Sequence, residues 1–176
     1  YEATIYLGDG SSDISINSDT GVLTFNSAPD YETKTSYTTT VTANDGTNSA
    51  TQNITVNVTN VNDNSPLITS SATFSAAENQ TAIGTVTATD ADGDTVSYSL
   101  SGTDASSMSI NSSSGVLTFS SAPDFETKTS YTAKVTASDG TDSTSQAITV
   151  SITDVDDVAP VFTSNATFSA AENQTA

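Results

Sequence analysis

The chain repeats itself at an interval of 94 residues, and this repetition limits the folds that are open to it. The string SAAENQTA begins at Ser75 and again at Ser169. Residues 14–64 and 108–158 are identical at 34 of 51 aligned positions. A unit of this length is large enough to fold as a domain, so we expect a tandem array of small, similar domains.

The repeat divides the chain into three expected segments. Residues 1–64 correspond to the C-terminal part of one unit, residues 65–158 to a complete unit, and residues 159–176 to the N-terminal start of the next. The chain begins at Tyr1 without a signal-like stretch, and we expect it to be an excerpt of a longer secreted protein.

Apolar and hydroxyl residues alternate within the complete unit, which is typical of antiparallel strands with one wet face. Gly-containing turn signals such as Asp92-Gly93 and Asp139-Gly140 separate the alternating runs. About seven strands are expected, at residues 73–77, 83–89, 96–100, 107–111, 116–120, 131–138 and 148–152. This pattern predicts an all-β fold of tandem Greek-key, immunoglobulin-like β-sandwiches without helices.

The charge of the chain excludes several classes of partner. It has 21 acidic residues against three Lys or Arg residues and no His, for a formal net charge of −18. Such a surface repels nucleic acid and anionic lipid, and its natural partners are metal cations or basic molecules. There is no Cys to form a disulfide and no apolar run long enough for a transmembrane helix, so we expect no membrane insertion in this segment.

Acidic and amide residues gather where one unit ends and the next begins. Residues 60–66 read NVNDNSP and residues 154–160 read DVDDVAP, each after a predicted strand and each ending in Pro. Further acidic motifs recur at fixed places in the units: AAEN at Glu78 and Glu172, D-Y/F-E at Asp30 and Asp124, DADGD at Asp90, and A-x-D-G at Asp45 and Asp139.

These five motifs, in this order, resemble the cadherin repeat, and most closely the cadherin-like tandem repeats of large bacterial surface adhesins. The resemblance covers all of residues 65–158 and the retained parts of the neighbouring units. It implies that the acids of one domain, the linker and the top of the next domain together bind calcium ions.

The resemblance implies one ligand set at each junction. At the first junction it implies the side chains of Asp30, Glu32, Asn62, Asp63, Asp90, Asp92 and Asp139 and the carbonyls of Val61 and Asn64, with Asp94 or a carbonyl near it as a further candidate. At the second junction it implies the side chains of Glu78, Asp124, Glu126, Asp156 and Asp157 and the carbonyls of Val155 and Val158. Where the family usually has a linker Asn, the second linker has Asp156, which still offers oxygen but adds charge.

The chemistry of these motifs is consistent with calcium without the family name. Calcium takes about six to eight oxygen ligands and accepts carboxylates, amides, carbonyls and water. In an extended D-x-E or D-x-D segment, side chains at i and i+2 point the same way, so paired acids converge. We expect the junction to splay without a cation and to stiffen when two domains share one ion.

The acidic motifs also partly fit two other interpretations. DADGD resembles the start of an EF-hand loop, but the positions for the required Gly and Glu hold Thr95 and Ser101. Asp139-Gly140 is also an ordinary hairpin turn, and this role is compatible with ligation. Catalysis is not expected, because no His is present to activate a hydroxyl nucleophile.

The sequence therefore predicts a calcium-stiffened segment of an extracellular adhesin or surface filament, of the kind found in biofilms, that acts as a stalk and in cell adhesion. Its expected partners are calcium ions and the adjacent repeats of the same chain. The alternative is a module that binds surface glycans or like copies on another cell. The absence of Trp and the inward phase of Tyr98, Phe119 and Tyr131 disfavour glycan binding.

Overall fold

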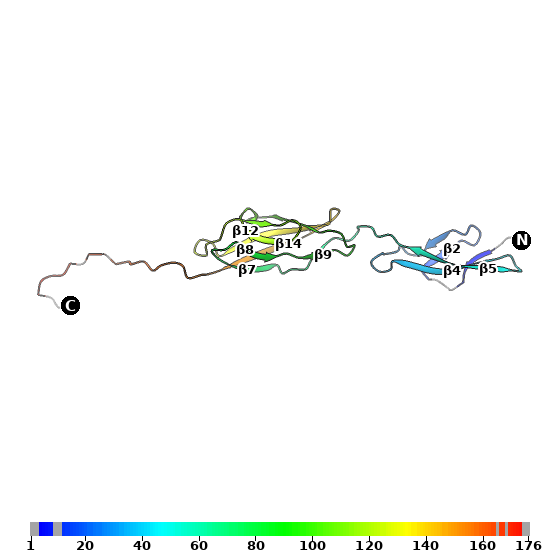
Figure 1. Cartoon of the computed structure of the whole chain (residues 1–176), viewed down its shortest axis with the longest axis horizontal. Helices are drawn as coiled ribbons and strands as arrows, with labels where there is room; N and C mark the ends of the chain where they lie inside the picture. Colours follow the sequence, from blue (N-terminus) through cyan, green and yellow to red (C-terminus); the bar gives the residue numbers. More distant parts are fainter. Residues whose placement is uncertain (1–3, 9–11, 165, 168, 174–176) are drawn as a thin grey trace.

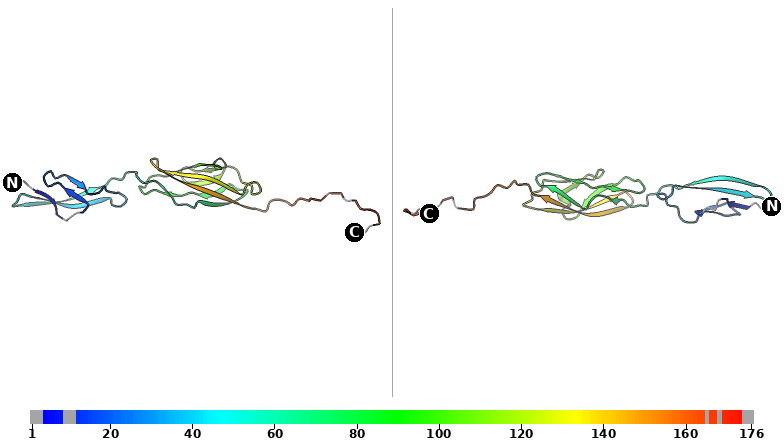
Figure 2. Two further views of the ribbon diagram at one scale, coloured as in Figure 1. Left: turned by 180° about the vertical axis from the view of Figure 1, so that it is seen from behind. Right: turned by 90° about the horizontal axis from the view of Figure 1, so that it is seen from below.

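The computed structural model describes residues 4–8, 12–164, 166–167 and 169–173. Two β-rich units lie end to end, joined by a short linker, and an extended segment leaves the far end of the second unit (Figure 1). Two further views show the same elongated arrangement (Figure 2). No described helix is both long and apolar enough to cross a membrane.

The described residues of the first unit form five strands in two sheets. The strands are β1 (Thr4–Leu7), β2 (Ile14–Ile16), β3 (Leu23–Phe25), β4 (Ser36–Asn44) and β5 (Ser49–Asn57). A three-stranded sheet has the order β1-β4-β5, and β2 pairs with β3. Both ladders of the larger sheet are antiparallel.

The second unit contains nine strands and one 3-10 turn. These are β6 (Leu67–Ile68), β7 (Thr73–Ala77), β8 (Ala82–Thr85), β9 (Ala88–Thr89), β10 (Ser97–Ser101), η1 (Ala105–Ser107), β11 (Met108–Ile110), β12 (Val116–Phe119), β13 (Ser130–Ser138) and β14 (Ser143–Thr153). The sheets have the orders β10-β13-β14-β7 and β11-β12-β8, with a small pair β6-β9. The predicted all-β sandwich is confirmed.

The alternation seen in the sequence produces the core of the second unit. Val135 on β13, Val150 on β14 and Leu117 on β12 are fully buried, so both larger sheets contribute apolar side chains to one cluster. Hydroxyl residues of the same strands face water; Thr132 and Ser151 are examples. This is the arrangement that a two-layer sandwich requires.

The structure corrects the predicted strands at several places; β6 was not predicted, and β14 begins at Ser143, before the expected residues 148–152. The strand expected at residues 83–89 is divided into β8 and β9, which belong to different sheets. Between them Val86 is 1% exposed and its N–H donates to the carbonyl of Gly115. The strand expected at residues 107–111 is shorter, because Ser107 ends the turn η1.

The first unit has a thinner core than the second, although the sequences are closely similar. Leu23 is 36% exposed, whereas its counterpart Leu117 is 0% exposed. Among the described residues, β5 pairs only with β4, whereas its counterpart β14 pairs with both β13 and β7. In the second unit this face is completed by β7 beside β14 and by β8, which pairs with β12 at Leu117.

Candidate metal centres at the unit junctions

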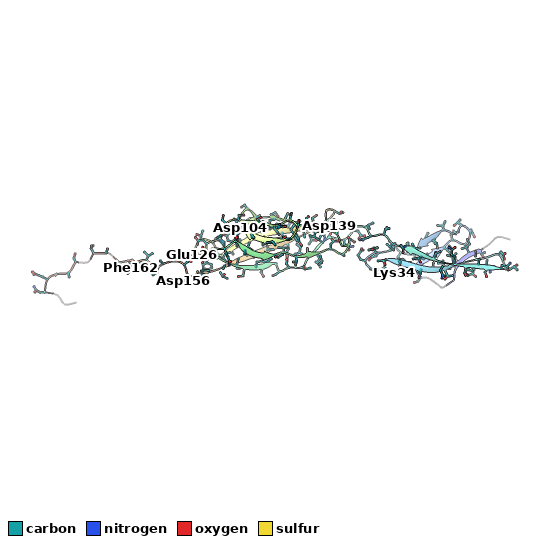
Figure 3. All side chains as sticks on the ribbon, viewed as in Figure 1. Lys34, Asp104, Glu126, Asp139, Asp156 and Phe162 are labelled. Atoms are coloured by element: carbon teal, nitrogen blue, oxygen red, sulfur yellow. The ribbon has the colours of Figure 1, made fainter. Side chains whose placement is uncertain are left out.

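Three segments meet between the two units. The first is the turn after Asp30 in the first unit, the second is the linker of residues 60–64, and the third is the loop of residues 90–94 that follows β9. A further loop, at Asp139, lies at the same end of the second unit (Figure 3). Each of these segments carries acidic or amide side chains that the sequence analysis assigned to the first ligand set.

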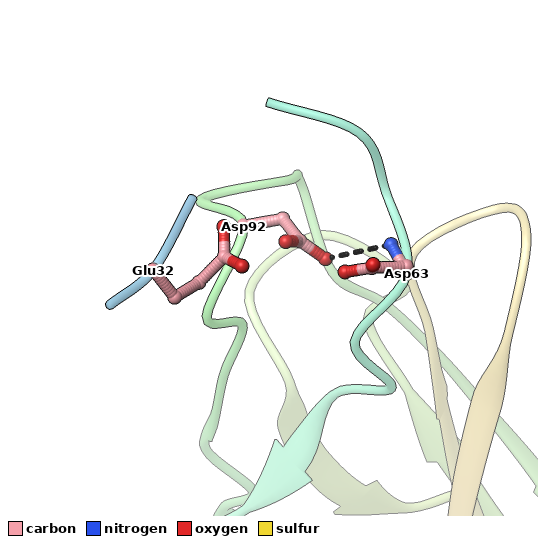
Figure 4. Close-up of side chains that lie close together, drawn as sticks. All are labelled: Glu32, Asp63 and Asp92. Carbon is pink, nitrogen blue, oxygen red and sulfur yellow. Dashed lines mark hydrogen bonds between the residues drawn. The ribbon is translucent and has the colours of Figure 1, made fainter. Parts of the chain in front are cut away.

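One carboxylate oxygen from each of Glu32, Asp63 and Asp92 lies within 4.8 Å of the other two. Figure 4 shows the three carboxyl groups in a row, contributed by the first unit, the linker and the second unit. Asp90, Asp92 and Asp94 form a second group that meets the same distance limit. Asp92 belongs to both groups and therefore lies at the centre of the junction.

Asp92 also anchors the linker by hydrogen bonds. Its Oδ2 accepts the backbone N–H groups of Asp63 at 3.1 Å and Asn64 at 2.8 Å. Its Oδ1 accepts the side-chain amide of Asn64 at 3.0 Å, and its main-chain carbonyl accepts the side-chain amide of Asn60 at 2.8 Å. The linker is thus fixed to the second unit through one residue.

The close carboxylates shift the pKa values of the junction in opposite directions. Desolvation, together with the hydrogen bond and negative charge of Asp92, raises the pKa of Glu32. Desolvation acts to raise the pKa of Asp92 too, but hydrogen bonds from Asn64 and Asp63 outweigh it and lower this pKa. Asp92 is therefore the more readily ionised of the two acids, as expected of neighbouring acids with different hydrogen-bond partners.

Three buried oxygens at this junction have no hydrogen-bond partner. They are Oδ1 of Asn62, Oδ2 of Asp90 and Oδ2 of Asp139, and all three residues belong to the first predicted ligand set. Leaving a buried acceptor unsatisfied costs about 1–3 kcal/mol. A cation that contacts these oxygens would remove this cost.

Asp90 and Asp139 each divide their two oxygens between the backbone and the junction. Oδ1 of Asp90 accepts the N–H groups of Asp92 and Asp94, and Oδ1 of Asp139 accepts those of Thr141 and Asp142. These N–H groups, with the side chain of Asn62, lower the pKa of Asp139. Asp139 therefore forms the expected hairpin turn and still has its second oxygen free for a ligand role.

Asp30 is not part of either carboxylate group. Its Oδ1 accepts the N–H of Thr33 at 3.1 Å, and its Oδ2 accepts the Thr33 hydroxyl at 3.0 Å. The Thr33 hydroxyl and N–H lower the pKa of Asp30. Both of its oxygens thus stabilise the turn, and Asp30 also lies beside Glu32, whose pKa its charge raises.

At the second junction, Glu78 is the central acid. It is only 3% exposed, and its oxygens accept the N–H of Phe125 at 2.8 Å and the N–H of Val155 at 2.7 Å. One oxygen of Glu78 lies within 4.8 Å of oxygens of Asp124 and Glu126. These acids therefore converge at the end of the second unit that faces away from the first.

The surroundings of Glu126 are strongly negative. A backbone hydrogen bond lowers its pKa, but desolvation and the charges of Glu78, Asp154 and Asp157 raise the pKa overall. Asp157 accepts a hydrogen bond from the side-chain amide of Asn79. Glu126 and Asp156 lie at this end of the unit (Figure 3), and Asp156 is exposed and belongs to no carboxylate group among the described residues.

The backbone carbonyls that complete the predicted ligand sets belong to exposed linker residues. Val61 is 61% exposed, Val155 is 44% exposed and Val158 is 60% exposed. Within the described part of the chain, no hydrogen bond is donated to the carbonyl of any of them or to that of Asn64. These four carbonyls are therefore free to face a cation.

Two lysines are engaged away from the carboxylate groups. Lys34 pairs with Asp13 at 2.8 Å and lies 4.1 Å from the centre of the Tyr37 ring. Lys128 pairs in the same way with Asp104 and lies 4.5 Å from the centre of the Tyr131 ring. These cations do not neutralise the acids of the junctions.

The donor role of Asn60 and Asn64 was not predicted from the sequence. The predicted metal ligands of the first linker included the side chain of Asn62 and the carbonyl of Asn64, whereas the structure uses the NH2 groups of Asn60 and Asn64 as hydrogen-bond donors. The available signal was the contrast between the two linkers, because NVNDN contains three amides and DVDDV contains none.

Comparison with known proteins places this geometry in a family. The Cadherin domain family matches residues 72–153. The chain is 36% identical to human Protocadherin Fat 4 over 138 residues, which are 73% of this chain and 3% of that protein. It is 33% identical to human Protocadherin Fat 1 over 174 residues, which are 90% of this chain and 4% of that protein.

Solved structures agree with the sequence relatives. The crystal structure of mouse Cadherin-23 EC22-24 matches with a TM-score of 0.76 and 26% identity, over 88% of this chain and 53% of that chain. The Protocadherin gammaB7 EC3-6 cis-dimer structure matches with a TM-score of 0.77 and 30% identity, over 89% of this chain and 43% of that chain. The chain thus spans a small part of the curated relatives and about half of these structures.

The comparison with these relatives tests several expectations from the sequence. The extracellular location is confirmed, since the matched structures are extracellular cadherin domains. The expectation of a non-enzymatic protein is confirmed by the family, whose members are structural adhesion proteins. The relatives are animal protocadherins, so they do not support a bacterial adhesin, a biofilm protein or a filament. Residues 72–153 match the Cadherin domain family, and the chain is similar over most of its length to animal protocadherins and to solved cadherin domains.

Proposed function

We propose that this chain is a calcium-stiffened segment of an extracellular adhesion stalk, in which calcium binds at the junctions and holds successive domains in line. One observation carries the proposal. Buried oxygens of Asn62, Asp90 and Asp139 have no partner, and they belong to a junction where acids of both units and the linker converge. Calcium prefers such a set of carboxylate, amide and carbonyl oxygens.

The proposed ligands fall into two sets. The first consists of Glu32, Asn62, Asp63, Asp90, Asp92 and Asp139 with the carbonyls of Val61 and Asn64, and Asp94 joins it because its carboxylate lies within reach of Asp90 and Asp92. The second consists of Glu78, Asp124, Glu126, Asp156 and Asp157 with the carbonyls of Val155 and Val158. Asp30 belongs to the first set as well, because its bonds to Thr33 match those of Asp124 to Thr127.

The proposed domain boundaries follow the linkers. We place the end of the first repeat at residue 64, the complete repeat at residues 65–158 and the start of the next repeat at residue 159. The sheets of the first and second units close on either side of residues 58–66. A cation at this boundary would be shared by two domains and would therefore restrict their relative motion.

Calcium would also stabilise the domains themselves. Binding at a free concentration of about 100 times the Kd adds about 2.7 kcal/mol to the free energy of unfolding. Cadherin domains generally bind calcium, which supports the assignment. The bacterial setting expected from the sequence is not needed for this function.

Homotypic binding is the second candidate function. The Protocadherin gammaB7 relative was solved as a cis-dimer, and this gives like copies of the chain more support than glycans. In the second unit, Phe119 packs edge-on against Tyr131 with ring centres 4.9 Å apart, and Phe119 is only 4% exposed. An aromatic platform for a sugar is therefore not offered by this pair.

Terbium luminescence tests the proposed first site directly. Tb³⁺ replaces Ca²⁺ in oxygen sites, and Tyr31, next to Glu32, can sensitise its emission. We expect a tyrosine-sensitised signal that calcium displaces, and a shorter, more flexible particle by X-ray scattering in chelator. Asp90→Asn should weaken binding, while Asp19→Asn, in an exposed loop, should not. Equal scattering curves in calcium and in chelator would refute the proposal.

The variant Tyr31→Phe separates sensitisation from binding. The second unit has Phe125 at the same position, so this substitution is compatible with the fold. It should abolish the luminescence, while calcium binding measured by calorimetry is retained. A signal that survives in Tyr31→Phe would mean that the lanthanide binds elsewhere.

A further inference from the structure

The two linkers differ in a way that changes their hydrogen-bonding chemistry. The first has amides at three positions where the second has acids or an apolar residue: Asn60, Asn62 and Asn64 against Asp154, Asp156 and Val158. Asn and Asp both offer oxygen to a cation, but only the amide can donate a hydrogen bond. The linkers are therefore similar as calcium ligands and different as hydrogen-bond donors.

The amides of the first linker are used as donors. Nδ2 of Asn60 donates to the main-chain carbonyl of Asp92 at 2.8 Å. Nδ2 of Asn64 donates to Oδ1 of Asp92 at 3.0 Å and to Oδ1 of Asp63 at 2.9 Å, and lies 3.4 Å from Oε2 of Glu32. One amide nitrogen thus lies among the three carboxylates shown in Figure 4, which come from both units and the linker.

A donor in this position counteracts the repulsion among the carboxylates. Hydrogen bonds to ionised acceptors are stronger than those between neutral groups, so an NH2 group between carboxylates partly takes the place of a cation. Two backbone donors, the N–H groups of Asp63 and Asn64, act on Asp92 in the same sense. All of these bonds are made by the protein alone.

The second linker cannot make the same side-chain bonds. Asp154 and Val158 have no side-chain donor at the positions of Asn60 and Asn64. The second linker also carries three acids, Asp154, Asp156 and Asp157, where the first carries only Asp63. It combines more negative charge with fewer groups that can offset it.

We propose that the side chains of Asn60 and Asn64 form an amide latch that seats the first linker on the second unit without a bound cation. A junction with the first linker sequence then loses less of its order when calcium is removed than one with the second linker sequence, which depends more strongly on the cation. This inference rests on the proposed function for the identity of the ion and deepens it, because it names residues that set how strongly a junction depends on calcium.

Spin labels on the two units test the latch. The chain has no Cys, so Ala50→Cys and Ala147→Cys, at exposed strand positions of the two units, give one defined pair of labels. The test variant is Asn60→Asp with Asn64→Val, which copies the second linker. The control is Asn53→Asp with Asn57→Val on β5, which makes the same changes in composition away from the junction.

Pulsed electron paramagnetic resonance then gives the distribution of distances between the units. In chelator, the test variant should show a broader distribution than the unaltered linker and the control. In saturating calcium, all three should coincide, because the proposed calcium ligand at residue 64 is the main-chain carbonyl. Equal widths in chelator would overturn the latch.

The outcomes separate the latch from the proposed function. Suppose that in chelator the distance distribution is narrow only for the unaltered chain and the control, and that calcium changes none of the three distributions. The latch then holds and calcium stiffening fails. If calcium narrows every distribution and the variants agree in chelator, calcium stiffening holds and the latch fails. Hydrogen exchange provides a label-free check, because the amides of Asp63 and Asn64 should exchange faster in the test variant in chelator.

Discussion

Glu78 offers the sharpest test of how the second junction is built, because a single substitution changes two hydrogen bonds. Its carboxylate is 3% exposed and accepts the N–H groups of Phe125 and Val155. Phe125 lies between two proposed ligands and Val155 lies in the linker. Glu78 therefore fixes both segments to β7, whether or not calcium is bound.

The expected cost of Glu78→Gln follows from these two bonds. The amide oxygen of Gln can accept one of the two N–H groups. Its NH2 group then faces the other N–H, and because both are donors, that N–H is left without an acceptor. A hydrogen bond to a charged group contributes about 1.5–3 kcal/mol, and an unpaired buried donor costs about 1–3 kcal/mol. We therefore expect Glu78→Gln to lower the free energy of unfolding of the second unit by about 2–3 kcal/mol in chelator.

Hydrogen exchange measured by nuclear magnetic resonance is the suitable assay, since it reports on each unit separately. The amides of Val135 and Val150, in central strands of the second unit, should lose protection in Glu78→Gln. Amides of β4 in the first unit should be unaffected. Unchanged protection of Val135 and Val150 in chelator would refute the reasoning.

Glu126→Gln is the matched control, with the same substitution at the same end of the unit. Desolvation and nearby acids raise the pKa of Glu126, so its ionised form is disfavoured in the folded state. A group with a raised folded pKa loses its stabilising contribution as the pH rises through that pKa. At neutral pH, neutral Gln should therefore leave protection in chelator unchanged or increase it, and a loss equal to that of Glu78→Gln would contradict this account.

Two further predictions use the repeat and the lysine pairs. Leu117→Ala, at a fully buried position, should lower the unfolding free energy of the second unit by about 2–5 kcal/mol. Leu23→Ala, at the 36% exposed counterpart, should cost its own unit less, and equal losses of protection by hydrogen exchange would contradict this. The hydrogen bond from Lys128 holds the pKa of Asp104 below its usual range, so its stabilising effect is present at neutral pH and is lost as the pH falls through that lowered pKa. At about pH 7, Asp104→Asn should therefore be less stable than the unaltered chain. At a pH low enough to protonate Asp104 in the unaltered chain, the two should be equally stable, which acid unfolding measures.

The sheets were predictable where alternation alone decides burial. The inward phase of residues 131–138 was read correctly, since Ala133, Val135 and Ala137 are all buried. Alternation cannot show which sheet a residue joins, however. In residues 83–89, Ile83 lies in one phase and Val86 and Ala88 in the other, and the chain passes there from the sheet of β8 to that of β9. Only the approach of Gly115 to Val86 reveals the crossing.

The acids of the junctions were predictable as residues but not as positions of atoms. Asp30 and Asp124 occupy the same motif, and each accepts hydrogen bonds from the Thr three residues later. Asp124 nevertheless shares a carboxylate group with Glu78, whereas Asp30 joins none among the described residues. The difference arises because β7 carries Glu78 to the motif in the second unit, and no described strand of the first unit corresponds to β7.

The linkers show why a comparison of ligands alone is incomplete. To a cation, exchanging Asn for Asp is a small change, because either side chain supplies an oxygen. To the surrounding acids it is a large one, because the amide donates a hydrogen bond and the carboxylate adds a negative charge. Asn64 lies among Glu32, Asp63 and Asp92, where this difference is greatest. It follows that the amides of a linker can adjust how far a junction depends on calcium while the oxygen ligands of the ion stay almost the same.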